Sequence, residues 1–222
     1  MLQSGRSVLV FLCHGVLPMQ HEKSVRILAT AALACFGLAA GGLLLMHVLR
    51  SDYPLASHMI SDYAVGKFGS VMTSVFVLWS AGIALLVSAL ILAEPSSPSR
   101  KLGALLLGVT SVGLLVSAAY RTDLPGLPDT HEGNVHTISF FVNIVCMLCA
   151  IPLLSFGFGP ASRLRSLRPT ALALAFGVVL AFLLQFFTLR RGMPYGLTNR
   201  LFVIVLLAWL AYTAARLRRL PA

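Results

Sequence analysis

Residues 70–93 read SVMTSVFVLWSAGIALLVSALILA, a long apolar run without a charged side chain. A helix needs about 20 apolar residues to cross roughly 30 Å of hydrocarbon. Because lipid offers no hydrogen-bond partners, the backbone groups must be satisfied within the segment, as they are in a helix. A strand of a membrane barrel would instead alternate polar and apolar residues over about 10 positions. The run therefore predicts a transmembrane helix.

Five further apolar runs accompany it along the chain. The six runs cover residues 27–48, 70–93, 102–120, 136–157, 170–189 and 201–217. The sequence of 222 residues is 58% hydrophobic and 11% charged, whereas soluble domains carry about 25% charged residues. These features predict an all-α integral membrane protein, a six-transmembrane-helix bundle. We expect a single membrane domain at 27–217, a cytoplasmic N-terminal segment at 1–26 and a cytoplasmic tail at 218–222.

The net charge of +10 comes from Arg and Lys side chains between the runs, which is typical of membrane topology and not of nucleic-acid binding. Eleven of them lie in the terminal segments and in the loops after the second and fourth runs, and six lie in the other loops. Cytoplasmic loops carry the excess of Lys and Arg. Both termini are therefore predicted to be cytoplasmic, and loops 50–69, 121–135 and 190–200 to face outward. The expected partners are membrane lipids, with no nucleic acid, and no protein partner is indicated.

The first outer loop contains SHMISD, residues 57–62. Ser57 is placed to cap a short helix. Within such a helix His58, Ser61 and Asp62 share one face, at positions i, i+3 and i+4. These residue types are components of nucleophile sites, in which Ser61 would be the nucleophile. The same pattern also fits a capped helix whose polar face meets water, so both interpretations stay open.

The second outer loop leads into the fourth apolar run. Asp129 and Glu132 have capping-box spacing, which predicts that the helix starts directly after Asp129. Glu132 and His136 then share a helix face, and Ser139 and Asn143 continue it inward. Because exposure of polar side chains to lipid is costly, this polar stripe should face the bundle interior.

These groups support two kinds of chemistry. A Glu-xxx-His pair can bind metal, so His58, Glu132 and His136 are candidate ligands for a zinc cofactor. For catalysis, His136 with Asp62 and Asp123 would supply acid–base groups. Alternatively, the residues form a metal-free hydrogen-bonded cluster or stay unconnected, with Glu132 as a helix-cap partner favoured by the helix dipole.

Four arginines are predicted on the outer face. Guanidinium groups suit phosphate and carboxylate, and lipid headgroups supply phosphate at this depth. Snorkelling and pairing with nearby acids is the alternative. The candidate ligand-binding residues are Arg121, Arg190, Arg191, Arg200, Asn143 and Gln185.

Three loop motifs follow one another in the sequence: His58-xx-Ser61-Asp62-xxx-Gly66, Asp123-x-Pro125 and Gly133-xx-His136. In these motifs the chain resembles an uncharacterised bacterial family of six-span membrane proteins, a domain of unknown function, over about residues 25 to 218. More distantly, its Ile-Ser-Asp motif is similar to the first loop of Frag-like and DRAM-like membrane proteins. The resemblance implies a multi-pass protein of the bacterial cytoplasmic (inner) membrane and transfers no activity.

Two functions fit these observations. The first is a site that binds or hydrolyses a lipid or other phosphate-bearing amphiphile at the outer leaflet. The second is a non-catalytic membrane scaffold or partner-binding protein, whose outer loops are locked by the same polar cluster. A transporter ranks third, because polar residues in the inner half are too sparse to form an evident path across the membrane.

Overall fold

The computed structural model describes residues 4–94, 97–160, 162–190 and 192–220. Within these ranges the chain forms six long α-helices, two short 3-10 helices and no strand. The elements are α1 (Ser4–Leu49), η1 (Ile60–Ala64), α2 (Gly69–Ala93), α3 (Pro98–Ala119), α4 (His131–Gly157), η2 (Arg165–Leu167), α5 (Arg168–Thr188) and α6 (Tyr195–Arg218). Each of the six α-helices includes a segment long and apolar enough to cross a membrane. The predicted all-α six-helix architecture is confirmed.

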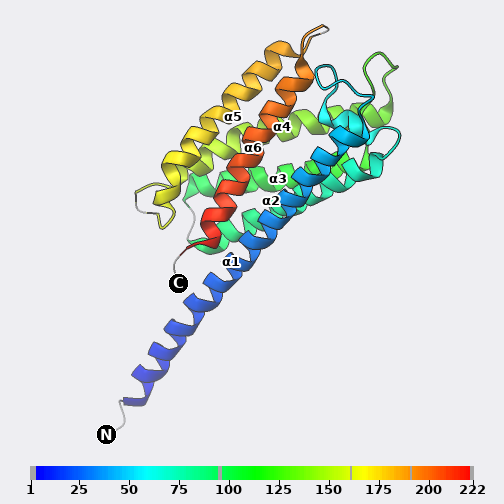
Figure 1. The fold of residues 1–222 in the computed structure, drawn as a ribbon. Coiled ribbons are helices and arrows are strands. Elements are labelled where there is room, and N and C mark those ends of the chain that lie inside the picture. The colour runs from blue at the N-terminus through cyan, green and yellow to red at the C-terminus, as the bar shows by residue number, and fades with distance from the viewer. Residues whose placement is uncertain (1–3, 95–96, 161, 191, 221–222) are drawn as a thin grey trace.

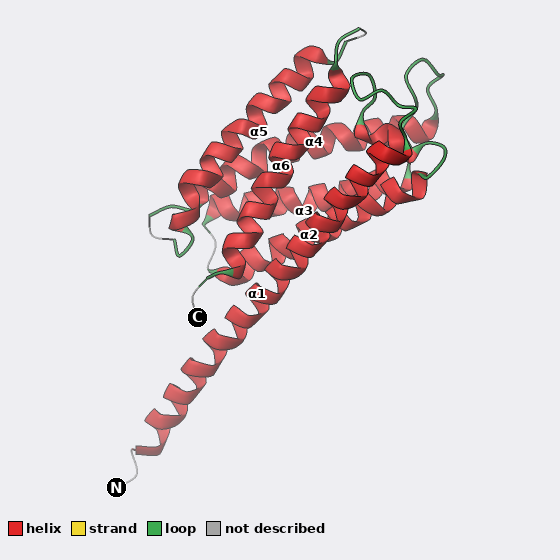
Figure 2. Cartoon of the chain, in the orientation of Figure 1, coloured by secondary structure: helices red, strands yellow, loops and turns green. Residues whose placement is uncertain are grey.

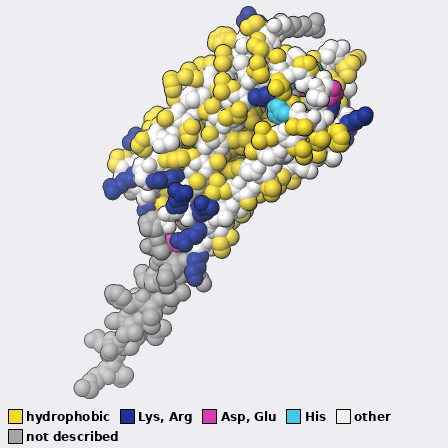
Figure 3. Space-filling model, in the orientation of Figure 1, with side chains coloured by type: hydrophobic (Ala, Val, Ile, Leu, Met, Phe, Trp, Pro, Cys, Tyr) yellow, Lys and Arg dark blue, Asp and Glu magenta, His cyan; other side chains and the backbone are white. Residues whose placement is uncertain are grey.

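The helices form an antiparallel bundle (Figures 1 and 2). Each long helix packs beside the next one along the chain, and α1 also packs on α6. Loop residues 50–68, 120–130, 189–190 and 192–194 lie at one end of the bundle, here called the loop end. The opposite end is the terminal end. Figure 3 shows Lys and Arg side chains gathered over the terminal end. The prediction that the terminal end is cytoplasmic depends on this same difference in charge.

Large apolar side chains occupy both the interior and the outside of the bundle. Met46, Ile83, Leu86 and Trp209 are fully buried between the helices. On the outside, Ile138 remains 65% exposed, with many other large apolar side chains around the bundle. Exposed apolar surface on this scale suits a hydrocarbon surrounding.

The start of α4 is held by Thr130. Its hydroxyl accepts a hydrogen bond from the backbone N–H of Gly133 at 3.0 Å, and the helix begins at His131. The predicted start is therefore confirmed. The capping oxygen belongs to Thr130 instead of Asp129, because the Thr130 hydroxyl also donates to Asp123 Oδ1 at 2.8 Å and is oriented by that bond.

Two segments differ from the predictions. The first helix continues through residues before 27, and its candidate span begins at His21. The helix predicted to start after Ser57 is wrong, because only the single 3-10 turn of η1 forms. The Ser57 hydroxyl pairs with His58 Nδ1 at 3.3 Å, and Asp62 Oδ2 accepts from the backbone N–H of Met59 at 3.0 Å, so Asp62 takes the capping role.

Candidate functional site

A cavity of about 70 Å³ lies inside the bundle between η1, α2, α3, α4 and α6. Its lining is mostly apolar and includes several aromatic side chains. Polar side chains reach it from four elements: Ser61, Ser117, His136, Asn143 and Asn199. A single water molecule needs a cavity of only about 10–15 Å³. The space is therefore large enough for a small chemical group.

Two residues that line this cavity each carry a buried polar atom with no hydrogen-bond partner among the described residues. These atoms are Trp79 Nε1 and Asn143 Oδ1. The other indole, that of Trp209, donates to Ser155 Oγ at 3.0 Å. Leaving a buried polar atom unpaired costs about 1–3 kcal/mol, and such atoms are rare. An indole N–H only donates and an amide oxygen only accepts, so Trp79 lacks an acceptor and Asn143 lacks a donor.

Asn143 lies against α3, where the facing residue is Gly113. A Cβ at Gly113 would come within 1.9 Å of Asn143 Oδ1. Ser139 Oγ donates to the Gly113 carbonyl at 2.7 Å, and Ser117 Oγ lies 3.4 Å from Ser139 Oγ. Small side chains thus bring α3 and α4 into close contact. The inward half of the predicted stripe, His136, Ser139 and Asn143, is buried as expected.

His136 has a defined tautomer. Its Nδ1 lies 2.8 Å from the Tyr120 carbonyl oxygen. A carbonyl can only accept, so Nδ1 carries the hydrogen and the neutral ring keeps its lone pair on Nε2. His136 is 4% exposed and shares the cavity lining with half-buried Ser61. The predicted base and the predicted nucleophile therefore border the same space.

Asp62 is buried beside this space and is not part of its lining. Burial raises the pKa of Asp62 to about 7, against the opposing effects of the Met59 backbone hydrogen bond and the positive charge of Arg200. The carboxyl group therefore holds a proton over much of the physiological pH range below 7. In the structure it caps η1 instead of contacting Ser61 or His136 through a described hydrogen bond.

Arg200 lies in the interior and is bonded within the fold, and its predicted role in binding an outer ligand stays a prediction. Its Nη1 donates to three carbonyl groups, those of Leu55, His58 and Gly196, at 2.6 to 3.0 Å. Its remaining donors contact Tyr63 Oη and His47 Nε2, both at 2.8 Å. The guanidinium thus ties the first outer loop to α1 and α6, as the scaffold hypothesis expects. Neither His47 nor Tyr63 was singled out from the sequence.

Arg50 makes a second loop anchor that sequence reasoning missed. Its guanidinium pairs with Asp52, donates to the Val65 carbonyl at 2.6 Å and lies 3.7 Å above the Tyr53 ring. The hydrogen bond with Asp52 raises the pKa of Arg50, and the same bond lowers the pKa of Asp52. The only signal in the sequence was the Arg-x-Asp spacing.

Asp123 also serves the fold. Its Oδ2 accepts from the Thr130 backbone N–H and its Oδ1 from the Thr130 hydroxyl, both at 2.8 Å. A Cβ at Gly133 would lie 1.9 Å from Asp123 Oδ2, so only glycine admits this carboxylate. Asp123 thus closes the second outer loop onto α4, and its predicted acid–base role stays a prediction.

The other predicted ligand-binding residues are dispersed. Arg121 and Arg190 are exposed at the loop end, and Arg191 lies outside the described residues. Gln185 is buried outside the lining of the cavity, and its Oε1 has no partner in the described part of the chain. Arg121, Gln185 and Arg190 do not line the cavity that Asn143 lines.

The tentative zinc ligands are not assembled. His58 stacks on Tyr53 with ring centroids 4.5 Å apart, and burial lowers its pKa. Glu132 is exposed, whereas His136 is buried. Among the described residues, no three or more His, Cys, Asp or Glu side chains form a group that could hold a metal ion.

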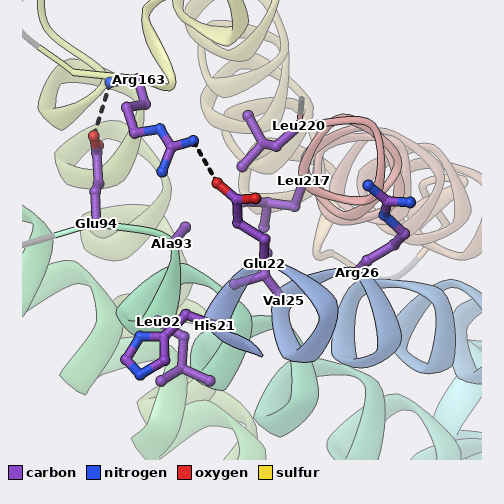
Figure 4. A pocket seen from close by; sticks show the side chains of 10 residues that line it. All are labelled: His21, Glu22, Val25, Arg26, Leu92, Ala93, Glu94, Arg163, Leu217 and Leu220. Carbon is purple, nitrogen blue, oxygen red and sulfur yellow. Dashed lines mark hydrogen bonds and ion pairs between the residues drawn. The ribbon is translucent and has the colours of Figure 1, made fainter. Parts of the chain in front are cut away.

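A larger cavity of about 220 Å³ lies at the terminal end (Figure 4). Arg163 crosses it, bonding to Glu22 Oε1 through Nη2 at 3.0 Å and to Glu94 Oε2 through its backbone N–H at 2.8 Å. Glu94 also binds Arg100 and Ser162. These charges neutralise one another and join α1 to the two loops of this end. We therefore assign these charged side chains a structural role.

Six helices long and apolar enough to span a membrane define an α-helical multi-pass membrane protein, and four of them enclose a largely apolar cavity with a few polar groups. The family model described as "Protein of unknown function (DUF998)" matches residues 9–216, and the chain belongs to this family. Comparison with curated proteins gave no match, nor did comparison with solved structures. The resemblance to a six-span family of unknown function is thus confirmed, and function has to be argued from the site.

Proposed function

We propose that this protein binds a membrane lipid that carries a free hydroxyl group, and that the hydroxyl occupies the interior cavity. The observation that carries the proposal is that two residues lining one cavity, Trp79 and Asn143, each carry a buried polar atom without a partner among the described residues. A hydroxyl both accepts and donates a hydrogen bond, so one alcohol group could satisfy both atoms. The apolar lining suits the carbon atoms next to that group.

The bound group is uncharged in this proposal. The described residues that line the cavity are apolar, Ser, His or Asn, and none is Lys, Arg, Asp or Glu. Burying an unpaired charge in such a space would be costly. The sequence predicted a phosphate-bearing ligand from four arginines. Of those that the structure describes, Arg121 and Arg190 are exposed and could contact a phosphate group. The proposed location is a bacterial inner membrane with the loop end outward, supported by the difference in charge between the two ends.

Tryptophan fluorescence tests the proposal. The chain has two tryptophans, so a Trp209→Phe variant reports from Trp79 alone. A monoacylglycerol with a brominated acyl chain, titrated into the variant in detergent, should quench this fluorescence with a saturable midpoint. Saturation is expected because one cavity holds one hydroxyl group.

The matched variant for this titration is Asn143→Leu in the same background. It removes the acceptor and the unpaired polar atom together, so the protein should fold at least as well. The quenching midpoint should rise about fivefold to tenfold, as expected from one lost hydrogen bond. The proposal would be contradicted if quenching rose linearly with lipid concentration and were equal in both proteins. The lipid would then contact the protein only non-specifically, and water would occupy the cavity.

Ester hydrolysis is a second candidate function, favoured by the placement of Ser61 and His136 on one cavity. The neutral His136 ring has its Nε2 lone pair available to take the Ser61 hydroxyl proton. The serine oxygen would then attack the ester carbonyl carbon, and the leaving alcohol would take up the proton. Water would hydrolyse the acyl-serine in a second step.

If the site hydrolyses monoacylglycerol, Ser61→Ala and His136→Asn should each lower fatty-acid release by about 100-fold or more. In His136→Asn the side-chain amide can still donate to the Tyr120 carbonyl, whereas Nε2 is lost. His131→Asn, at an exposed position of the same helix, should keep wild-type turnover. Undiminished turnover in the Ser61 and His136 variants would exclude this function and leave binding alone.

A further inference from the structure

A groove of about 520 Å³ runs along the outside of α3 and α4. Val112, Ile138 and Val142 are among its apolar walls, and Gly113 and Ser139 also line it. Both helices belong to candidate spans, so the groove faces the hydrocarbon of the membrane. At that depth the molecules that can fill an apolar groove are the acyl chains of lipids.

Only a thin layer of small residues separates the groove from the interior cavity. Gly113 lines the groove and Asn143 lines the cavity, yet a Cβ on Gly113 would stand 1.9 Å from Asn143 Oδ1. Ser139 of the groove and Ser117 of the cavity lie 3.4 Å apart through their hydroxyl oxygens. The two helices are thus in close contact between the two spaces.

The atom that approaches Gly113 most closely is the unpartnered one. Asn143 is 5% exposed, and its Oδ1 has no hydrogen-bond donor among the described residues. A donor that arrives between α3 and α4 would meet this acceptor first. The Ser139–Gly113 hydrogen bond that closes the gap is a single bond between uncharged groups, and such bonds contribute little net stability.

We propose that the lipid enters sideways from the membrane, with its acyl chain in the α3–α4 groove and its hydroxyl passing Gly113 to reach Asn143. This inference rests on the proposed function and specifies its ligand class. The ligand is a neutral glyceride, with an acyl chain for the groove, a free hydroxyl for the cavity and no charged headgroup. The loop end, closed by Arg200 and Asp123, is then not the entrance.

Filling the groove tests the route without altering the cavity. Val142 lines the groove and is 44% exposed, whereas Val145 lies on the same helix outside the groove and is 60% exposed. Val142→Phe and its matched control Val145→Phe are made in the Trp209→Phe background. Ile138→Phe is a second substitution in the groove. It shows whether an effect of Val142→Phe comes from filling the groove or from a local folding defect at residue 142.

Each variant is titrated with two probes, the brominated monoacylglycerol and the short alcohol 3-bromopropan-1-ol. Val142→Phe and Ile138→Phe should raise the midpoint for the glyceride about tenfold, because its chain loses apolar contact. Val145→Phe should stay within about twofold. The short alcohol has no chain to place, so its midpoint should be the same in all variants.

The outcomes separate the two proposals. Equal glyceride midpoints in Val142→Phe, Ile138→Phe and Val145→Phe would overturn the groove as a binding site. If the short alcohol still quenched Trp79 saturably, the cavity would remain a hydroxyl site with another entrance. If neither probe gave saturable quenching even in the parent variant, the proposed function itself would fail.

Discussion

Replacing Arg200 by leucine should destabilise the protein by about 3–5 kcal/mol. The guanidinium donates to three backbone carbonyls, to His47 and to Tyr63. Leucine fills similar space but offers no donor, so buried acceptors of the first outer loop would lose their partner. Thermal unfolding in detergent, followed by circular dichroism, measures the loss.

The control is Arg190→Leu, at an exposed position of the same end. It should change stability by no more than about 0.5 kcal/mol, as is usual for surface positions. Arg200→Lys should fall between the two, because one ammonium group cannot span His47 and the loop carbonyls as a planar guanidinium does. Equal melting of Arg200→Leu and Arg190→Leu would show that Arg200 does not lock the loops, and would return it to the candidate ligand-binding residues.

Asp62→Asn should remove much of the pH dependence of stability between pH 5 and pH 8. The folded protein keeps a proton on Asp62 up to about pH 7, because burial raises its pKa from 3.8. The unfolded chain has lost that proton well below pH 7. Stability from this group is therefore complete below about pH 4 and is lost as pH rises towards 7. Wild-type protein should be less stable at pH 8 than at pH 5 by about 2–3 kcal/mol from this group.

Asparagine keeps an oxygen that can accept from the Met59 N–H but has no proton to lose. The Asp62→Asn variant should be more stable than the wild type at pH 8. The difference in stability between the two proteins should vanish towards low pH. His58 acts in the opposite direction, because its lowered pKa favours the folded state as pH rises, and it does so in both proteins. Melting curves of both proteins are measured at pH 5, 6, 7 and 8. The difference in stability between the two proteins at each pH gives the contribution of Asp62. Parallel curves for the two proteins would refute the assignment.

Several features of the fold were open to prediction because they depend on local sequence. The length and hydrophobicity of each run indicate a membrane-spanning helix, because every helix must be long enough to cross the same hydrocarbon thickness. The start of α4 beside Thr130 follows from cap chemistry within four residues. The burial of His136, Ser139 and Asn143 follows from helical periodicity, which puts them on one face.

The site itself was only partly predictable. Ser61, His136 and Asn143 were named from the sequence and line the cavity, whereas Trp79 and Asn199 were not named. A tryptophan within an apolar run gives no sign that its N–H lacks a partner. Arg200 and Asp123 were predicted to be site residues because a charged side chain in an outer loop fits a ligand-binding or catalytic role. Arg200 bonds to Leu55, which is distant in the sequence, and Asp123 bonds to Thr130 across a loop, so the sequence pattern did not show these hydrogen bonds.

The amino-acid sequence by itself determined the membrane class, the number of helices and the polar face of α4, because these depend on the hydrophobicity and spacing of residues close together in the chain. Tertiary structure decided which polar groups are satisfied. The carbonyls around Arg200 come from the first outer loop and α6, and the close contact of Gly113 with Asn143 joins α3 to α4. Partners across helices depend on packing distances of a few ångströms, and the sequence pattern of one helix does not encode them.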